Sequence, residues 1–144
     1  MLRDCLFREN KLNKSLNDEN VRRFVRHCFI GKIFPEAIPS LIRVLKNGKG
    51  EIKGYAAVAL GRAGPAAKDA VPLLIKVLKD EKNKDVRWNV VYAVGMIGDK
   101  SSLETLYYVA KQDSNKDVRN AAKEAIKKIN ARSRSGSKKT KRFF

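Results

Sequence analysis

The chain repeats one pattern three times along its length. Each copy reads as an apolar helix, a turn rich in Lys, Asp, Asn or Gly, and a second helix. The three copies occupy residues 37–64, 70–98 and 102–129. Equivalent residues, such as Ile52, Val86 and Val118, lie 32 to 34 positions apart. Because a period of this length is typical of helical repeats that stack side by side, the sequence predicts an all-α solenoid.

We expect one repeat domain over residues 1–130 and a separate tail over residues 131–144. The helix pairs are expected at about 1–33, 34–64, 65–100 and 101–130. The first pair is the least regular, because its middle is polar and Asn-rich and only residues 21–33 fit the second-helix pattern. An irregular end repeat is normal where a solenoid must meet water on one side.

Proline and glycine mark the predicted helix boundaries. Pro39 and Pro72 recur in the same context, near a helix start, where the missing amide costs little. The second helices are rich in Ala and Gly, as in YAAVALGRAG, which predicts that neighbouring helices approach closely. The glycines of this pattern are expected to break or end the second helices; they are Gly61, Gly64, Gly95 and Gly98.

Composition limits the class and the compartment. The formal net charge is +17, from 32 basic and 15 acidic residues, so the surface attracts polyanions. Cys5 and Cys28 are the only cysteines, which excludes a disulfide scaffold. The charged start MLRDCLFREN does not resemble a signal peptide, and no apolar stretch approaches the ~20 residues that span a bilayer. We therefore expect a cytoplasmic protein.

The C-terminal segment 131–144 differs from the repeats in composition. It contains six basic residues and no acidic residue, and it has too few apolar side chains to order itself by burial, so we expect a flexible tail. Such an arm binds RNA or DNA by releasing counterions; the alternative is a tail that only keeps the chain soluble. KKTKR would also serve as a nuclear import signal in a eukaryote. Phe143 and Phe144 either form an anchor that inserts into a pocket of a partner, or occur at the end of this polar segment by chance. The basic residues are Arg132, Arg134, Lys138, Lys139, Lys141 and Arg142.

A second basic feature follows the turns within the helix pairs. Stacking would bring these turns onto one edge, where lysines could follow a phosphate backbone. The alternative is an ordinary solvated edge, because acidic residues such as Asp80, Asp85 and Asp117 alternate with the lysines. The candidate nucleic-acid-binding lysines of this edge are Lys49, Lys82, Lys84 and Lys116.

The repeat outline A-x-P-x-L-x-x-x-L-K-D…D-V-R-x-x-A-A-x-A-L-G-x-I-G resembles HEAT repeats, especially the short prokaryotic kind also found in phycobilin lyases. The resemblance covers roughly residues 34–130, with a weaker copy at 1–33. It implies a right-handed superhelix of about three and a half helical pairs. It also implies that a polar or acidic residue after each first helix pairs with a basic residue early in the second helix. The implied pairs are Asn47/Lys53, Asp80/Arg87 and Asp113/Arg119, of which the first lacks an acid.

The resemblance implies that the second helices line a concave face. Two columns of positions outside the core then run along it: Arg23, Gly54, Trp88 and Asn120, and His27, Val58, Tyr92 and Glu124. Trp88 and Tyr92 lie four residues apart, so they share one helix face. With Arg87 beside them they form a candidate protein-binding patch, which Arg23 and His27 would extend. The alternative is that Trp88 packs under the neighbouring repeat and Tyr92 edges the core.

The residues give little support for an enzyme. His27 is the only histidine, and Cys28 occupies the small core position that Ala59, Ala93 and Ala125 hold in other repeats. Neither metal-ligand spacing nor a phosphate-binding loop is present, so we expect no catalytic residue, metal or cofactor. Other HEAT-like repeats occur in phycobilin lyases and alkylpurine DNA glycosylases, but no catalytic set is reproduced here.

The sequence therefore predicts a non-enzymatic binding scaffold. The tail and the basic edge would engage RNA, a ribonucleoprotein or DNA, while the repeats bind a protein. The alternative is a protein–protein adaptor or assembly factor with no nucleic-acid role.

Overall fold

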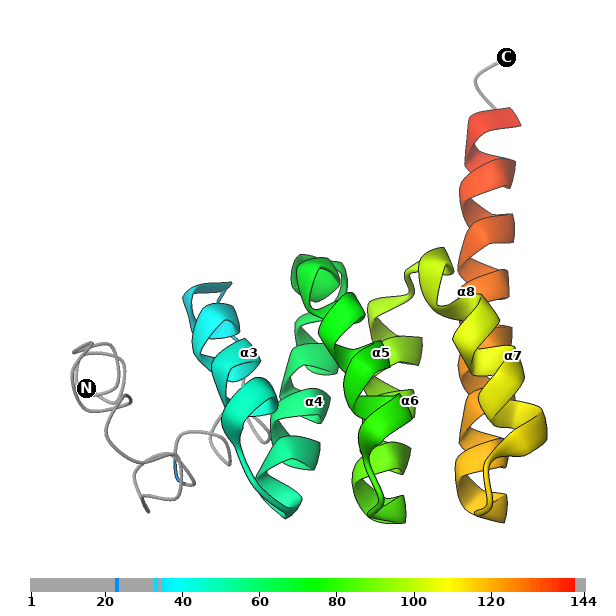
Figure 1. Cartoon of the computed structure of the whole chain (residues 1–144). Helices are drawn as coiled ribbons and strands as arrows, with labels where there is room; N and C mark the ends of the chain where they lie inside the picture. The colour runs from blue at the N-terminus through cyan, green and yellow to red at the C-terminus, as the bar shows by residue number, and fades with distance from the viewer. Residues whose placement is uncertain (1–22, 24–32, 34, 142–144) are drawn as a thin grey trace.

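The protein is described here by a computed structural model, which covers Arg23, Ile33 and residues 35–141 and is helical over almost all of that length (Figure 1). The α-helices are α3 (Ile38–Asn47), α4 (Glu51–Ala63), α5 (Val71–Asp80), α6 (Lys84–Ile97), α7 (Leu103–Gln112) and α8 (Lys116–Lys141). Three 3-10 segments precede first helices: η1 (Pro35–Ala37), η2 (Gly64–Ala70) and η3 (Lys100–Ser102). The described residues contain no strand, which confirms the predicted all-α class.

The helices form three consecutive pairs arranged in two layers. In Figure 1, α3, α5 and α7 make one layer, and α4, α6 and α8 make the other. In the second layer α4 packs against α6, and α6 against α8. The turns within the pairs lie together along one edge, at the bottom of Figure 1. One pair lies within each of 34–64 and 65–100, whereas the third begins within 101–130 and runs on to Lys141. The expected first repeat, 1–33, lies outside the described residues except at Arg23 and Ile33.

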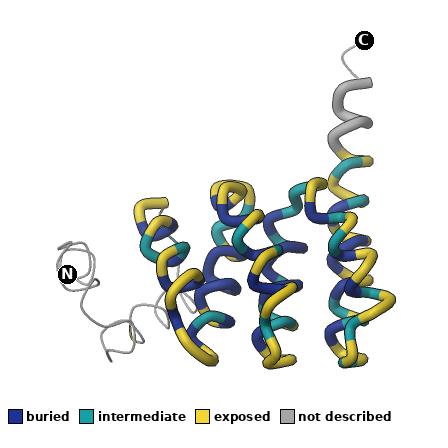
Figure 2. The backbone as a smooth tube through the Cα atoms, viewed as in Figure 1, coloured by how far each residue is buried: buried dark blue, intermediate teal, exposed yellow. Residues whose placement is uncertain are grey.

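The core lies between the two layers, where Figure 2 shows the buried positions. The three equivalent residues of the repeat, Ile52, Val86 and Val118, are all buried there. Each buried aliphatic side chain of this size stabilises the fold by about 1.5–3 kcal/mol. The largest fully buried side chains are Leu41, Leu45, Leu60, Leu74, Leu106 and Ile129.

Helix starts follow the sequence signals. Pro39 and Pro72 stand in the first turns of α3 and α5, as predicted. Two of the second helices, α6 and α8, begin with asparagine caps, whereas α4 follows Gly50 and has no side-chain cap. The side chain of Asn83 accepts a hydrogen bond from the Asp85 amide at 2.9 Å, and Asn115 does the same for the Asp117 amide at 2.9 Å. Such caps satisfy amides that have no partner within the helix.

Only two of the four glycines end helices. Gly64 and Gly98 follow α4 and α6 with φ values of 66° and 79°, a backbone conformation that glycine adopts without strain. The expectation that Gly61 and Gly95 break or end helices is wrong, because both lie inside a helix and are buried there.

Gly61 and Gly95 instead set the distance between second-layer helices. A Cβ atom on Gly61 would lie 2.7 Å from the Cα of Ala93, and one on Gly95 would lie 2.8 Å from the Cβ of Ala125. Both distances are shorter than any real contact of a Cβ atom, so a larger residue requires the backbones to separate. Each of these two glycines thus faces an alanine on the next helix, which confirms the predicted close approach.

Two ion pairs among the described residues join successive repeats. Arg87 donates two hydrogen bonds to Asp113 of the following pair, from Nε to Oδ2 at 2.9 Å and from Nη2 to Oδ1 at 3.1 Å. Lys53 likewise reaches Glu81 of its following pair, at 3.8 Å between Nζ and Oε2. The implied pairs Asn47/Lys53 and Asp80/Arg87 are therefore wrong.

The arginines also bind carbonyls of their own turns, and this explains the difference. Nη1 of Arg87 donates to the carbonyl of Lys82 at 2.8 Å, and Nη1 of Arg119 donates to the carbonyl of Asp113 at 2.6 Å. Carbonyls just after a helix have no helical partner and carry the negative end of its dipole. Arg87 already binds a backbone carbonyl of its own turn, and its carboxylate partner, Asp113, comes from the neighbouring repeat. Asp113 and Arg119 are paired, but only through the Asp113 carbonyl.

The start of the basic segment also differs from the expectation. The sequence favoured no regular structure after 130, yet α8 continues to Lys141, while residues 142–144 lie outside the described part. Extending an existing helix adds one hydrogen bond per residue without a new nucleus, so it needs no burial. Arg132 further fixes the extension by donating from Nη1 to the Met96 carbonyl at 2.7 Å. No helix in the described part of the chain is long and apolar enough to cross a membrane.

We predict that Gly61→Ala destabilises the protein although alanine favours helix. The new methyl group meets the Ala93 backbone, and separating α4 from α6 should lower the free energy of unfolding by about 1–3 kcal/mol. Gly54→Ala is the matched control in the same helix, because its methyl group meets only the end of the Asn89 side chain, which can rotate away. Urea unfolding followed by circular dichroism measures both; equal stabilities would show that Gly61 does not set the helix spacing.

We predict that Arg87→Lys lowers the free energy of unfolding by about 1–3 kcal/mol, because lysine keeps the charge but cannot make both bonds to Asp113 and the bond to Lys82. The side chains of Arg87 and Asp113 are only 11% and 9% exposed, so water cannot replace those bonds fully. Lys53→Gln is the comparison, with an expected loss below about 1 kcal/mol, because its longer ion pair is partly solvated. Thermal unfolding of the two variants at one pH measures both losses. A larger loss of stability in Lys53→Gln than in Arg87→Lys would contradict the prediction.

Candidate protein-binding groove between α6 and α8

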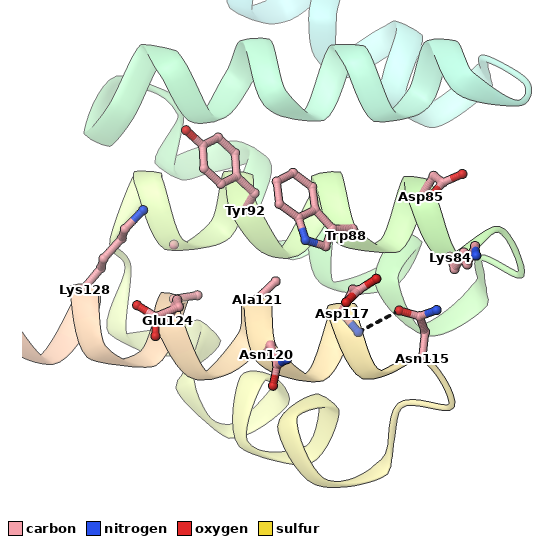
Figure 3. Close-up of a pocket in the computed structure, with 12 residues that line it drawn as sticks. Lys84, Asp85, Trp88, Tyr92, Asn115, Asp117, Asn120, Ala121, Glu124 and Lys128 are labelled. Atoms are coloured by element: carbon pink, nitrogen blue, oxygen red, sulfur yellow. Dashed lines mark hydrogen bonds between the residues drawn. The ribbon is translucent and has the colours of Figure 1, made fainter.

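An open groove of about 730 Å³ runs between α6 and α8 in the second layer (Figure 3). We call it the α6–α8 groove. One wall comes from α6, the other from α8, and the end nearest the turns comes from the helix starts. Its lining residues are Lys84, Asp85, Trp88, Tyr92, Gly95, Asn115, Asp117, Asn120, Ala121, Glu124, Ala125 and Lys128.

The α6 wall is a pair of stacked aromatic rings. The centroids of Trp88 and Tyr92 lie 5.5 Å apart and the ring planes differ by 7°. Trp88 is 40% exposed and Tyr92 is half-buried, so the indole presents much of its surface to solvent. Lys128 reaches from α8 toward Tyr92, with its amine 5.2 Å from the ring centroid, within the range of a cation–π contact (Figure 3). The tyrosine is thus held by two contacts, whereas the indole stays accessible.

The floor of the groove consists of small residues. Gly95, Ala121 and Ala125 lie where α6 and α8 come closest. Side chains this small leave space above them, so the groove exists because the helices are close and the residues between them are short. The glycine that sets the helix spacing therefore also shapes the groove.

The charges around the groove have mixed sign. Two amines, on Lys84 and Lys128, and three carboxylates, on Asp85, Asp117 and Glu124, line it. A phosphate backbone is a poor match for three carboxylates. A segment of a protein partner, with apolar, polar and charged groups, fits this lining better.

The structure separates the residues of the predicted protein-binding patch. Trp88 and Tyr92 share a face and meet Asn120 and Glu124 of the predicted columns across the α6–α8 groove. Arg87 does not line this groove, because its guanidinium is held by Asp113 and by carbonyls of its own turn.

The predicted column positions on α4 do not extend the open surface. Gly54 and Val58, the column positions on α4, are buried. Arg23 is exposed in a helical position, and His27 lies outside the described residues, as does Cys28.

The predicted basic edge is present as exposed side chains. Lys49, Lys82, Lys84 and Lys116 are all exposed near the turns along the lower edge of Figure 1. Acidic residues are exposed between them, namely Glu51, Asp80, Asp85 and Asp117. The edge therefore carries both signs.

Two of the tail arginines can be placed. Arg132 is bound to the Met96 carbonyl, and Arg134 is exposed. The side chains of Lys138, Lys139 and Lys141 lie outside the description, as do Arg142, Phe143 and Phe144 altogether.

Sequence reasoning missed two exposed tyrosines on the opposite layer. Tyr107 and Tyr108 of α7 are 50% and 69% exposed, and Tyr108 borders a second hollow of about 820 Å³ between α5 and α7 that also includes Arg87. An alignment of the first helices could have identified this position. Tyr108 is equivalent to Lys76 of the preceding repeat, and a position that holds lysine is expected to be exposed. Among the described residues, no group of three or more His, Cys, Asp or Glu is placed to hold a metal ion.

Comparison with protein families gives a match to HEAT repeats over residues 38–127, which is more than half of the chain. The chain belongs to the HEAT-repeat family. This confirms the resemblance that the sequence analysis stated. The matched range contains α3 to α7 and the part of α8 that closes the groove of this HEAT-repeat protein.

Among solved structures, the HEAT-repeat chain is similar to human deoxyhypusine hydroxylase in complex with glycerol. The two share 25% sequence identity with a TM-score of 0.68, over 85% of this chain and 42% of the hydroxylase chain. This HEAT-repeat chain thus corresponds to less than half of that protein. Comparison with curated proteins gives no match.

We predict that Trp88→Ala lowers the free energy of unfolding of this HEAT-repeat protein by less than about 1 kcal/mol, since an exposed ring adds little to the core. Val90→Ala, two residues along α6, should cost about 2 kcal/mol, because Val90 is fully buried. Trp88 is also the only tryptophan of the sequence, so acrylamide should quench the native fluorescence efficiently. A quenching-resistant tryptophan, together with a large loss of stability in Trp88→Ala, would mean that the ring belongs to the core.

Proposed function

We propose that this HEAT-repeat chain is a non-enzymatic binding scaffold. It holds a segment of a protein partner in the α6–α8 groove, while its basic tail and basic edge engage RNA, a ribonucleoprotein or DNA. The observation that carries the proposal is the exposed Trp88 ring, stacked on Tyr92 above a floor of small residues.

Ring geometry supports the protein-binding part. Tryptophan and tyrosine dominate the energetics of protein interfaces because large, rigid, amphipathic rings bury much area at little entropic cost. Here the partner would place an apolar or cationic side chain on the indole, and polar groups against the surrounding carboxylates and amides. The residues that contact it are Trp88, Tyr92, Asn120 and Glu124, with Arg23 and His27 as further contacts toward the N-terminus.

Charge supports the nucleic-acid part. A net charge of +17 creates a long-range field that attracts phosphates, and the six basic residues after 130 have no acidic neighbour in that segment. The basic edge contributes less, because its exposed acidic residues oppose the field of its lysines. We further propose a cytoplasmic location and a right-handed superhelix of about three and a half pairs, as the family resemblance implies.

The mixed charges of the basic edge favour a second candidate, a protein–protein adaptor or assembly factor without a nucleic-acid role. A hydroxylase-like activity is a weaker candidate. The similar solved protein is an enzyme by name, but this chain matches less than half of it. The α6–α8 groove also presents no His, Cys or Ser from the described residues that line it.

We predict that the double variant Trp88→Ala, Tyr92→Ala loses protein partners that the unaltered chain captures. The full chain would serve as bait in extract from its native host, with and without nuclease, and the captured proteins would be quantified by mass spectrometry. The matched control is Tyr107→Ala, Tyr108→Ala, which removes two exposed rings from the opposite layer. A partner set that the first variant keeps, or that both variants lose equally, would refute the groove.

The nuclease arm separates the two candidates. A scaffold that engages nucleic acid should lose part of its partner set after nuclease treatment, and a chain ending at residue 135 should lose the same part while keeping the groove partner. Residue 135 is the better end point than 130, because it preserves the bond from Arg132 to Met96. An adaptor would be indifferent to nuclease and to the truncation.

A further inference from the structure

The outer face of α8 carries a row of cations that the sequence analysis did not recognise as one surface, although it named Lys116 and Arg134 separately. We call Lys116, Lys123, Lys127 and Arg134 the α8 row. They are seven, four and seven residues apart, a spacing that places them on one face of a helix, and all four are exposed. The buried residues Val118, Ala122, Ala125 and Ile129 follow the same kind of spacing on the opposite side. The row therefore points away from the core, at the end of the described stack in Figure 1.

No carboxylate of α8 lies within this row. The helix has two acidic residues, Asp117 and Glu124, and both line the α6–α8 groove instead. Glu124 does bond Lys127 at 3.1 Å, but the two side chains are 65% and 74% exposed. A solvated pair of this kind contributes little and leaves the amine available. The α8 row thus differs from the basic edge, where acidic residues alternate with the lysines.

Resting on the proposed function, we propose that the α8 row is a binding site for the phosphate backbone of a nucleic-acid duplex. From Lys116 to Arg134 the helix advances by eighteen steps of about 1.5 Å, which makes the row about 27 Å long. That length matches about eight base pairs at 3.4 Å per pair. In the sequence, the same spacing continues at Lys138 and Lys141, so the site would extend into the arm.

The chemistry of the row favours a duplex over a single strand. Proteins that hold single strands combine cations with aromatic rings on which the bases stack. From residue 116 to residue 141 the sequence contains no aromatic residue, so α8 offers charge alone. A straight, continuous helix also holds its cations in a fixed line, which suits a stiff polymer whose phosphates are fixed too.

A membrane surface fits less well than a duplex. Helices that lie on anionic membranes insert apolar side chains beside their cations. The apolar side chains of α8 larger than alanine are Val118, Ile126 and Ile129, and all three are buried within the fold. Only the polar face is free, so no insertion can accompany the electrostatic attraction.

The test compares three variants of the full chain that each remove three positive charges. The row variant is Lys123→Gln, Lys127→Gln, Arg134→Gln. The matched control is Lys46→Gln, Lys68→Gln, Lys76→Gln, three exposed lysines on other elements. The tail variant is Lys138→Gln, Lys139→Gln, Lys141→Gln. Affinity for a 30-base-pair DNA duplex, an RNA duplex and a single strand of equal length would be measured by fluorescence anisotropy across a salt series.

For duplex DNA, the slope of log affinity against log salt should be less negative in the row variant by about 2.7. This is about 0.9 for each of three lost phosphate contacts. The control variant should leave the slope unchanged. DNA and RNA duplexes should both respond, because only phosphates are contacted. If the row and control variants behave alike, or if only the tail variant loses affinity, the α8 row is refuted while the proposed polyanion binding stands.

Two further outcomes have separate meanings. A single strand that binds as tightly as the duplex would refute the duplex preference. An unaltered chain that binds neither duplex would refute both the α8 row and the nucleic-acid part of the proposed function, and would leave the α6–α8 groove untouched.

A measurement on the unaltered chain avoids any effect of the substitutions on folding. Brief acetylation followed by mass spectrometry reports the accessibility of each lysine. The duplex should protect Lys116, Lys123 and Lys127 several-fold and leave Lys46 and Lys76 reactive. Equal protection of both sets would contradict the proposal.

Discussion

Close contact between neighbouring second-layer helices is the constraint on which the rest of the structure depends. Gly61 faces Ala93, and Gly95 faces Ala125, at distances that exclude any Cβ atom on the glycines. Because α4, α6 and α8 are this close, the apolar side chains between the layers can be fully buried by only the three helix pairs that the structure describes. The same closeness leaves a shallow floor between α6 and α8, on which the Trp88 and Tyr92 rings form a wall.

Charge is distributed over the molecule by the same packing. The acidic residues of α8 line the α6–α8 groove together with Lys128, whereas the cations of the α8 row lie on the face opposite the buried Val118 and Ile129. The result is one helix with a groove face of mixed charge, opposite the Trp88 and Tyr92 rings, and an outer face on which cations predominate. A net charge of +17 is therefore no guide to where a phosphate would bind, since the groove itself carries more carboxylates than amines.

Much of the fold could be predicted from the sequence, because a repeated pattern of buried positions is local information. The helix pairs, the burial of Ile52 and Val86, and the role of Pro72 all follow from it. The partner of Arg87 could not be predicted, since it depends on how two repeats stack and not on either repeat alone. The helix after residue 130 was missed for a different reason. Low apolar content predicts that a segment cannot bury itself, but a helix that extends from a folded body needs no burial.

The unequal length of α8 has a mechanical consequence. The same helix forms one wall of the groove and then projects beyond the neighbouring helices (Figure 1). The hydrogen bond from Arg132 to the Met96 carbonyl holds it to α6 near the point where the projection begins. The projecting end and the groove wall that carries Asn120 and Glu124 therefore belong to one continuous helix, and a molecule bound to the first is joined to the second through unbroken backbone hydrogen bonds.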